Sequence, residues 1–340
     1  MSGVIPLSKI QIGRETNLGT AVDGTEKLRV EGAFLQDARE IQPVAENVGL
    51  LVDTDRMVIP SLAAMIQIPE NNATFEQIGH ILEMGVKTVT PSQDGAGSGY
   101  ISTYNLPTTA QLTPKTYTLE GGDDQQAMVV EAVFAEEFTL SGNVREPLKF
   151  TAGLFGRQAG NDSFTSGAVL VSVEEMLFQN CKVYIGDAAN DFGNASDLLS
   201  NYLLGFTLNV RTGYVARYTA NGNLYYAYIK QVKPEYTLDL RVEHDTNAEA
   251  EITDGRAKTA RLVRILCEGS TLGTAGDTYS KKTFIIDLAG KYTSIPAIED
   301  DEGSSIMNFS LRGGYNTTIA TMGKFVLVNE RVDLVEEAVS

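Results

Sequence analysis

The stretch Gln125–Arg157, QQAMVVEAVFAEEFTLSGNVREPLKFTAGLFGR, decides the fold class that we expect. In its first arm apolar and polar side chains alternate with a period of two, which is typical of a half-buried β-strand. The apolar face carries Met128, Val130, Ala132, Phe134, Phe138 and Leu140, interrupted by Glu136, and the other face carries Glu131, Glu137 and Thr139. Ser141-Gly142-Asn143 supplies turn residues, and the alternation resumes over Leu148–Leu154. We therefore predict one long β-hairpin.

Both arms of this predicted hairpin exceed the length of a typical strand, about 5–6 residues. Its edge and outer face offer more surface than a single chain needs in order to form its own core. We expect that surface either to remain in water or to pair with a neighbouring chain, because exposed strand edges are templates for further pairing.

Composition excludes several classes of protein. The 340 residues contain 27 Lys and Arg against 44 Asp and Glu, a net charge of −17. A duplex-DNA reader neutralises phosphates with basic residues, so this chain is not expected to be one. The acidic balance fits a surface that DNA slides past, or serves solubility alone. Cys181 and Cys267 are too few for a disulfide scaffold and are expected to be buried free thiols.

The remainder of the chain predicts mainly β structure with short helices. We expect an extended arm over residues 1–27, strands over 28–48 and 49–68, and a helix over Thr74–Gly85 that opens with a capping box at Thr74 and Gln77. No apolar run approaches the roughly 18 residues of a membrane span, and the N-terminus lacks a signal-peptide pattern, which favours folding in a cytoplasm.

Thr88–Pro114 is rich in Gly and Pro and is predicted to be a long functional or flexible loop. A strand over Thr116–Glu120 follows it. In the second half we predict a hairpin of Leu204–Val210 with Val215–Tyr218, a turn at Asn221-Gly222, and a solvated acidic turn at Glu299–Glu302. Further strands are predicted at 238–242, Arg261–Cys267, Lys281–Leu288, Met307–Leu311 and Phe325–Val328.

The order of strand, loop and capped helix occurs twice. Thr246 with Glu249 forms a second capping box, 172 positions after Thr74. We infer an internal duplication, with one β domain at 1–160, a second at 168–340 and a linker at about 160–167.

Candidate catalytic groups are sparse. Neither His80 nor His244 has a nucleophile beside it, so both are expected to be structural. Adjacent acids such as Glu136-Glu137 point to opposite faces of a strand and form no convergent pair. The Gly95–Gly99 segment lacks a following helix and the Gly-Lys-Ser/Thr of a phosphate loop. Other acidic groups are expected to be ordinary surface: Glu174-Glu175, and the polar loop Asp187, Asn190, Asp191 and Asn194, whose spacing is not that of an EF-hand. No catalytic, cofactor or metal site is predicted.

The chain resembles the major tail tube proteins of long-tailed bacteriophages. The resemblance lies in Gly13–Ala21, GRETNLGTA, in the order of elements around the Thr74–Gly85 helix, in Leu119-Glu120-Gly121-Gly122, and in the hairpin that ends Phe155-Gly156-Arg157. The family implies an antiparallel β-sandwich with a flanking helix, whose long strands join in rings into a β-barrel around a DNA conduit. The rings stack through a long loop and terminal arms.

The resemblance implies a non-enzymatic structural subunit of the virion tail, assembled in the host cytoplasm. Its partners are expected to be copies of itself, tape measure and tail-end proteins, with DNA passing through unbound; three doubled chains or six chains complete a ring. Glu131 and Glu137 are expected to face an acidic lumen, with Lys149 and Arg157 paired or near its ends. The expected inter-ring loop contains Asp94, Gly95, Gly97, Gly99 and Tyr100. The alternatives are another phage structural protein, such as a tail terminator or capsid decoration, and a two-domain β-sandwich carbohydrate hydrolase.

Overall fold

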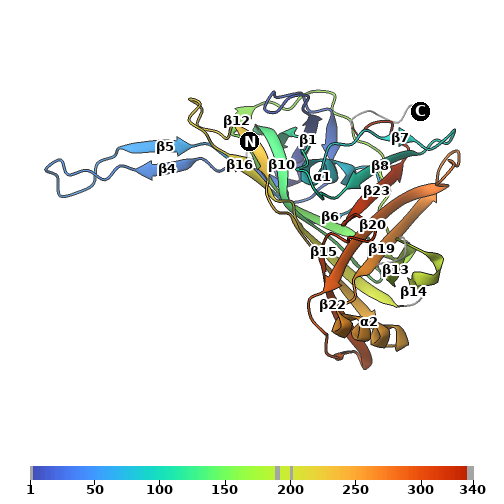
Figure 1. The fold of residues 1–340 in the computed structure, drawn as a ribbon. Helices are drawn as coiled ribbons and strands as arrows, with labels where there is room; N and C mark the ends of the chain where they lie inside the picture. The colour runs from blue at the N-terminus through green and yellow to red at the C-terminus, as the bar shows by residue number, and fades with distance from the viewer. Residues whose placement is uncertain (1–2, 188–191, 200–201, 335–340) are drawn as a thin grey trace.

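The computed structural model describes residues 3–187, 192–199 and 202–334. The described chain is mainly β with antiparallel pairing, as the period-two pattern predicted (Figure 1). Two sheets enclose the principal core, which is a sandwich-like arrangement. None of the helices in the described ranges is long and apolar enough to cross a membrane.

The first layer, which we call the front sheet, contains the predicted hairpin. Its strands, in spatial order, are β3 (Phe34–Asp37), β6 (Ala64–Asn72), β11 (Lys149–Gly156), β10 (Ala127–Asn143), β15 (Leu203–Arg211), β18 (Glu235–Glu243), β22 (Ser304–Gly313) and β21 (Glu299–Asp301). Glu299–Asp301 was predicted to be part of a turn. It forms an edge strand instead, because it pairs with β22 and the turn falls at Glu302-Gly303.

The second layer, the back sheet, has the order β14 (Leu198–Leu199), β13 (Cys181–Asp187), β19 (Arg261–Thr271), β20 (Lys281–Tyr292), β23 (Gly323–Asn329), β8 (Tyr100–Asn105) and β7 (Ser92–Gln93). The end of β20 also pairs with β22, which joins the two sheets at one corner.

A smaller sheet contains β2 (Glu26–Leu28), β1 (Lys9–Arg14), β9 (Tyr117–Gly122), the first part of β10, and β12 (Ala159–Asp162). Two separate hairpins are β4 (Glu40–Pro43) with β5 (Met57–Ser61), and β16 (Tyr214–Arg217) with β17 (Tyr228–Gln231). The helices are α1 (Ile78–Gly85) and α2 (Thr246–Ala257), with short 3-10 turns at Ile5–Leu7, Phe178–Asn180 and Ala195–Asp197.

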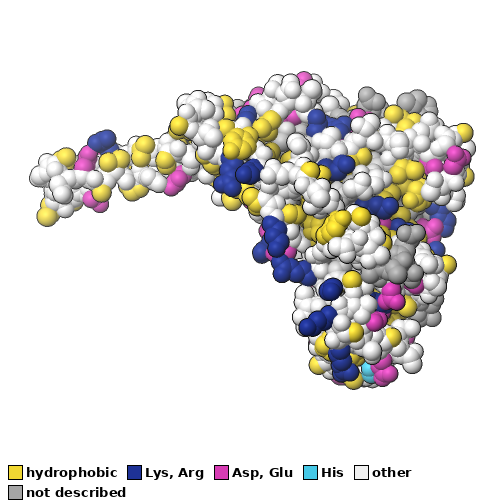
Figure 2. Space-filling model, in the orientation of Figure 1, with side chains coloured by type: hydrophobic (Ala, Val, Ile, Leu, Met, Phe, Trp, Pro, Cys, Tyr) yellow, Lys and Arg dark blue, Asp and Glu magenta, His cyan; other side chains and the backbone are white. Residues whose placement is uncertain are grey.

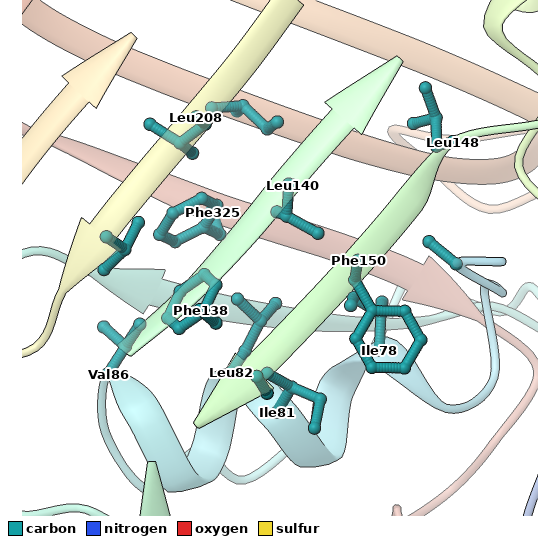
Figure 3. Close-up of a cluster of buried hydrophobic side chains, with 14 of the residues drawn as sticks. Ile78, Ile81, Leu82, Val86, Phe138, Leu140, Leu148, Phe150, Leu208 and Phe325 are labelled. Atoms are coloured by element: carbon teal, nitrogen blue, oxygen red, sulfur yellow. The ribbon is translucent and has the colours of Figure 1, made fainter. Parts of the chain in front are cut away.

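The main core lies between the two sheets and is closed by α1 (Figure 3). All eight residues of α1 are buried, because Ile78, Ile81 and Leu82 repeat at helical spacing and project toward the sheets. Phe138 of the front sheet contacts Phe325 of the back sheet with ring centroids 6.2 Å apart. This contact shows directly that the two sheets pack face to face.

The long hairpin is present, but its details differ from the prediction. β10 continues through Ser141-Gly142-Asn143, since all three residues pair with β15 and Ser141 also pairs with β11, and the turn follows at Val144–Glu146. Neither arm is left to pair with another chain, because β15 lies along β10 and β6 along β11.

Two irregularities in β10 change which side chains share a face. Pairing shifts register between Val130 and Val133 and again between Ala135 and Glu137, and Ala132 has φ of 55°. A bulge inserts an extra residue and reverses the alternation beyond it. Phe134 therefore lies in a separate small hydrophobic cluster with Tyr214 and Tyr226. The prediction that Phe134 and Phe138 share one face of the strand is wrong.

Several further predictions are wrong because strand pairing between segments distant in sequence overrides the local sequence pattern. The extended arm predicted over residues 1–27 is not separate from the body, because β1 within it is buried between β2 and β9. β15 does not form a hairpin with β16, which leaves the sheet and pairs with β17 across the predicted Asn221-Gly222 turn. The cap of α2 is Asp245, one residue before Thr246. The helix predicted over Thr74–Gly85 begins only at Ile78, with Gln77 as its N-cap. Half of the predicted capping box forms: Thr74 Oγ1 accepts a hydrogen bond from the Gln77 N–H at 3.3 Å, but the Gln77 side chain donates to Glu26 and to the Lys27 carbonyl instead.

The division into domains at 1–160 and 168–340 stays a prediction. Strands of the two halves are neighbours in both sheets, at β10 with β15 and at β8 with β23, and one hydrophobic core contains residues of both. The matched helices also differ in environment, since α1 is buried throughout and α2 buries only Ala248 and Glu251.

Candidate functional site

The exposed face of the front sheet is polar from Lys149–Gly153 of β11 across the second part of β10, β15, β18 and β22, and we call this region the polar face. On β3 and β6 the same side of the sheet exposes Phe34 and Met65 instead. Alternation throughout β18 and over most of β15 and β22 sends apolar side chains into the core and polar ones outward. Cross-strand register aligns the outward residues in rows, for example Thr139, Asn209 and Thr237 on three adjacent strands. Strands from both halves of the chain build this one surface.

Glu137 lies on the polar face, exposed, and directly opposite Arg211 on β15. Glu131 does not share its position. It is half-buried, lies within the first irregularity of β10, between Val130 and Val133, and accepts a hydrogen bond from Gln158 at 3.4 Å. Burial raises the pKa of Glu131, opposed by nearby Arg157. The structure therefore separates two carboxylates that the alternation placed together.

The polar face carries both signs of charge. Its acids include Glu137, Glu235 and Asp239, and its bases include Lys149, Arg211, Arg241 and Arg312. The bases lie beside carboxylates. Lys149 is 2.8 Å from Glu70, Arg312 is 2.5 Å from Glu235, and Arg241 is 2.6 Å from Asp301. Arg211 lies in register between Glu137 and Glu235.

Arg157, at the end of the return arm, is also held by contacts within the chain. Its guanidinium donates to the carbonyls of Tyr226 and Ala227 at 3.1 and 3.2 Å and lies over the Tyr225 ring.

A long hairpin, which we call the arm, projects from one side of the body (Figure 1). It spans residues 38–62 and is built on β4 and β5, with Val44 N–H donating to the Arg56 carbonyl at 3.0 Å. Figure 2 shows hydrophobic side chains along it. The exposed large apolar residues of the arm are Ile41, Val48, Leu50, Leu51, Val52, Met57, Val58 and Ile59.

The sequence pattern predicted strands in this region but did not indicate that it leaves the body. Leu51 at the tip is fully exposed. One feature of the sequence could have indicated a projecting hairpin. The apolar run Leu50-Leu51-Val52 follows Gly49, which has φ of 80°, and a hairpin tip normally carries polar residues, so an apolar tip suggests a contact surface.

The predicted inter-ring loop is docked on its own chain. Asp94 is buried, and its carboxylate accepts hydrogen bonds from the Thr278 and Tyr279 N–H groups at 3.0 and 2.7 Å. Gly95 and Gly97 lie against Asp277 and Gly276 with no room for a side chain, and Gly99 against Leu272. Tyr100 begins β8, so the predicted loop contains a strand that pairs with β23.

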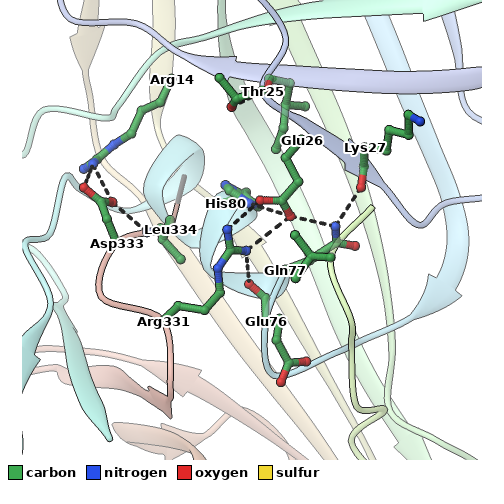
Figure 4. Close-up of polar contacts among 12 residues, drawn as sticks. Arg14, Thr25, Glu26, Lys27, Glu76, Gln77, His80, Arg331, Asp333 and Leu334 are labelled. Carbon is green, nitrogen blue, oxygen red and sulfur yellow. Dashed lines mark hydrogen bonds and ion pairs between the residues drawn. The ribbon is translucent and has the colours of Figure 1, made fainter. Parts of the chain in front are cut away.

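His80 lies in a buried polar network that ties the C-terminal segment to α1 (Figure 4). Its Nδ1 is 3.2 Å from the Tyr117 hydroxyl and its Nε2 is 3.5 Å from Glu26. Arg331 binds Glu26 through both terminal nitrogens, at 2.6 and 3.2 Å. Burial opposes ionisation of Glu26, but His80 and Arg331 outweigh it and lower its pKa to about 2.

A parallel set of contacts extends this network. Arg14 bridges Glu83, at 2.7 Å, and Asp333, at 2.9 Å, and the Tyr117 hydroxyl donates to Glu83 at 2.8 Å. These contacts join residues from both ends of the described chain.

The other candidate groups form no reactive centre. Glu174 accepts two hydrogen bonds from Ser270 and pairs with Lys282 at 3.2 Å. His244 lies 3.9 Å from Glu249 on α2. Of the polar loop considered for calcium, Asn190 and Asp191 lie outside the described residues. In the part of the chain that is described, no group of three or more His, Cys, Asp or Glu could hold a metal ion.

Comparison of the chain with protein-family models and with curated protein sequences gives no match. The structure defines a mainly β, sandwich-like protein with a charge-balanced polar face and a projecting apolar arm.

Proposed function

We propose that the chain is a non-enzymatic structural subunit of a bacteriophage tail tube, which polymerises as stacked rings around a channel that conducts DNA. The resemblance of the sequence to tail tube proteins suggests this function. Three features of the structure support it: the arm, two free strand edges, and the balance of charge on the polar face.

The exposed apolar arm is the observation that most strongly supports self-assembly. A hairpin with eight large exposed apolar side chains is a recognised interaction surface, since monomeric proteins rarely keep such patches in water. Because the tip lies away from the body of its own chain (Figure 1), a second copy is the partner that self-assembly requires. The arm takes the part in ring stacking that was expected of Thr88–Pro114.

The front sheet has a free edge at each end. Among the described residues, no second strand pairs with Ile68–Asn72 of β6 or with Met307–Phe309 of β22. Pro69 lies in the first of these edges, as is typical of edge strands. Pairing the β6 edge of one copy with the β22 edge of the next is a head-to-tail contact, which closes into a ring when its rotation closes.

The polar face would then line the channel. A wall that conducts DNA must not hold phosphates, and unpaired Lys and Arg supply most non-specific DNA affinity. On this face carboxylates neutralise the bases locally, for example Glu235 at Arg312. This differs from the acidic lumen predicted from the sequence but has the same consequence for DNA.

Electron microscopy and sedimentation of the purified full chain test the proposal. Wild-type protein should form rings or tubes, whose mass distinguishes three chains per ring from six. The variant Leu50→Asp/Leu51→Asp/Val52→Asp should stay unassembled, whereas Asp53→Ser/Asp55→Ser, which changes charge at the same tip, should assemble. Tubes formed by the triple variant would contradict the role of the arm. Monodisperse wild-type protein that cleaves polysaccharide would favour the hydrolase alternative.

A further inference from the structure

The two cysteines, expected to be separate buried thiols, are cross-strand neighbours. Cys181 begins β13, Cys267 lies in β19, and the two residues are directly paired in the antiparallel ladder between them. They are 86 positions apart in sequence (267 − 181), so only the tertiary fold brings them together.

Their side chains lie on the same side of the back sheet, because opposed residues of adjacent strands share a face. Both thiols donate to one acceptor, the Leu177 carbonyl, at 3.8 Å from Cys181 and 3.5 Å from Cys267. Opposed residues in an antiparallel pair have Cα atoms about 4.5–5.5 Å apart, and a disulfide requires about 4.4–6.8 Å. The backbone spacing therefore already suits a bond.

We propose that Cys181 and Cys267 form a redox-sensitive site. A small-molecule disulfide acts there as the oxidant and converts the two thiols into a cross-strand disulfide that links β13 covalently to β19. This inference does not depend on the proposed function. It concerns a covalent modification within one chain, whatever that chain assembles into.

The unequal exposure of the two residues sets the order of the steps. Cys181 is half-buried and Cys267 is 1% exposed, so the oxidant meets Cys181 first. With oxidised glutathione, the Cys181 sulfur displaces one glutathione thiol and forms a mixed disulfide. The Cys267 sulfur then attacks the Cys181 sulfur and displaces the second glutathione. The protein loses two protons and two electrons, and the oxidant becomes two molecules of reduced glutathione.

The surroundings make this reaction slow at neutral pH. The adjacent Cys267 thiol and burial raise the pKa of the Cys181 thiol, which disfavours the attacking thiolate. Alkaline conditions should accelerate the reaction. The closed loop contains β14, β15, β18 and α2, so the bond would restrict a large part of the unfolded chain.

The test treats the folded full chain with oxidised glutathione at alkaline pH and measures intact mass, peptide linkage and urea unfolding. We expect the loss of two hydrogen atoms, a non-reduced peptide linking Cys181 to Cys267, and a higher urea midpoint that dithiothreitol reverses. The midpoint of Cys181→Ser should not change with oxidant.

Mixed disulfides that persist on Cys181, dimers linked between chains, or two thiols that remain free would each overturn the proposal. A rise in midpoint for Cys181→Ser would also overturn it, since no intramolecular bond can then form. The mass and the peptide linkage are measured on wild-type protein, so the test holds even where the variant fails to fold.

Discussion

Glu137 on β10 and Arg211 on β15 are directly opposed residues of adjacent antiparallel strands, on the exposed face of the front sheet. Arg211 is opposed on its other side by Glu235 of β18. An opposite-charge pair in this position is worth roughly 0.2–1 kcal/mol, which is small for stability. The two opposed carboxylates act mainly on the surface potential, because they partly offset the positive charge of Arg211 on the polar face.

The first prediction concerns this charge balance. Glu137→Lys places two cations side by side, so the assembled variant should bind short duplex DNA at low ionic strength, with a salt dependence steeper by roughly one unit of slope for each additional phosphate that the protein neutralises. Glu131→Lys makes the same change in a half-buried carboxylate away from this face, and should leave DNA binding unchanged. Fluorescence anisotropy over a salt series measures both. Equal DNA binding by the two variants would show that the polar face does not line the channel.

The second prediction concerns the buried pair of Glu26 and Arg331, which are 2% and 4% exposed. Arg331→Met removes the guanidinium from the buried Glu26 carboxylate, which keeps only His80 and Gln77 beside it, and should lower the free energy of unfolding by about 3–5 kcal/mol. The double variant Glu26→Leu/Arg331→Met should lose less than the sum of the two single changes. Urea denaturation measures the cycle, and strict additivity would show that the two side chains do not interact.

The third prediction follows from the pKa of Glu26, which lies at about 2 in the folded protein against 4.5 ordinarily. Because the folded value is the lower one, this group stabilises the protein fully above about pH 4.5, and its contribution of roughly 3 kcal/mol is lost as the pH falls toward 2. Unfolding free energies should therefore decrease more steeply with acid in wild type than in Glu26→Gln. Parallel pH profiles would argue against the assignment.

The fourth prediction compares two candidate caps of α2. Asp245 accepts hydrogen bonds from the Asn247 and Ala248 N–H groups at 2.8 and 3.0 Å, so Asp245→Ala should cost about 1 kcal/mol of stability. Thr246→Ala, at the residue that the sequence pattern favoured, should change stability little. Thermal denaturation of both variants decides between them, and a larger loss for Thr246→Ala would restore Thr246 as the cap.

The fifth prediction concerns the turn between β10 and β11. Arg145 is exposed and has φ of 69°, a conformation that is strained for any residue with a Cβ atom. Arg145→Gly should raise the free energy of unfolding by about 0.5–1 kcal/mol, whereas Arg145→Val should lower it. The reverse order in urea midpoints would show that the arginine side chain itself stabilises the turn.

The sequence by itself determined the elements whose signal is local. Strict alternation in Leu238–Val242 and Met307–Leu311 predicted strands with one buried face, and the stripe of Ile78, Ile81 and Leu82 predicted α1, because solvent and core impose those periods on the chain directly.

Only the tertiary structure decided which strands pair and which surfaces remain free. Ser141-Gly142-Asn143 has the composition of a turn, yet pairing with β15 keeps it in a strand. The bulges of β10 separate Glu131 from Glu137, Asp94 is buried by contacts 184 residues away, and residues 38–62 leave the body although their local pattern is that of ordinary strands. The reason is the same in each case. Hydrogen-bond and packing partners that are distant in sequence override the local preference of a segment, and the residues of that segment do not reveal which partners they will meet.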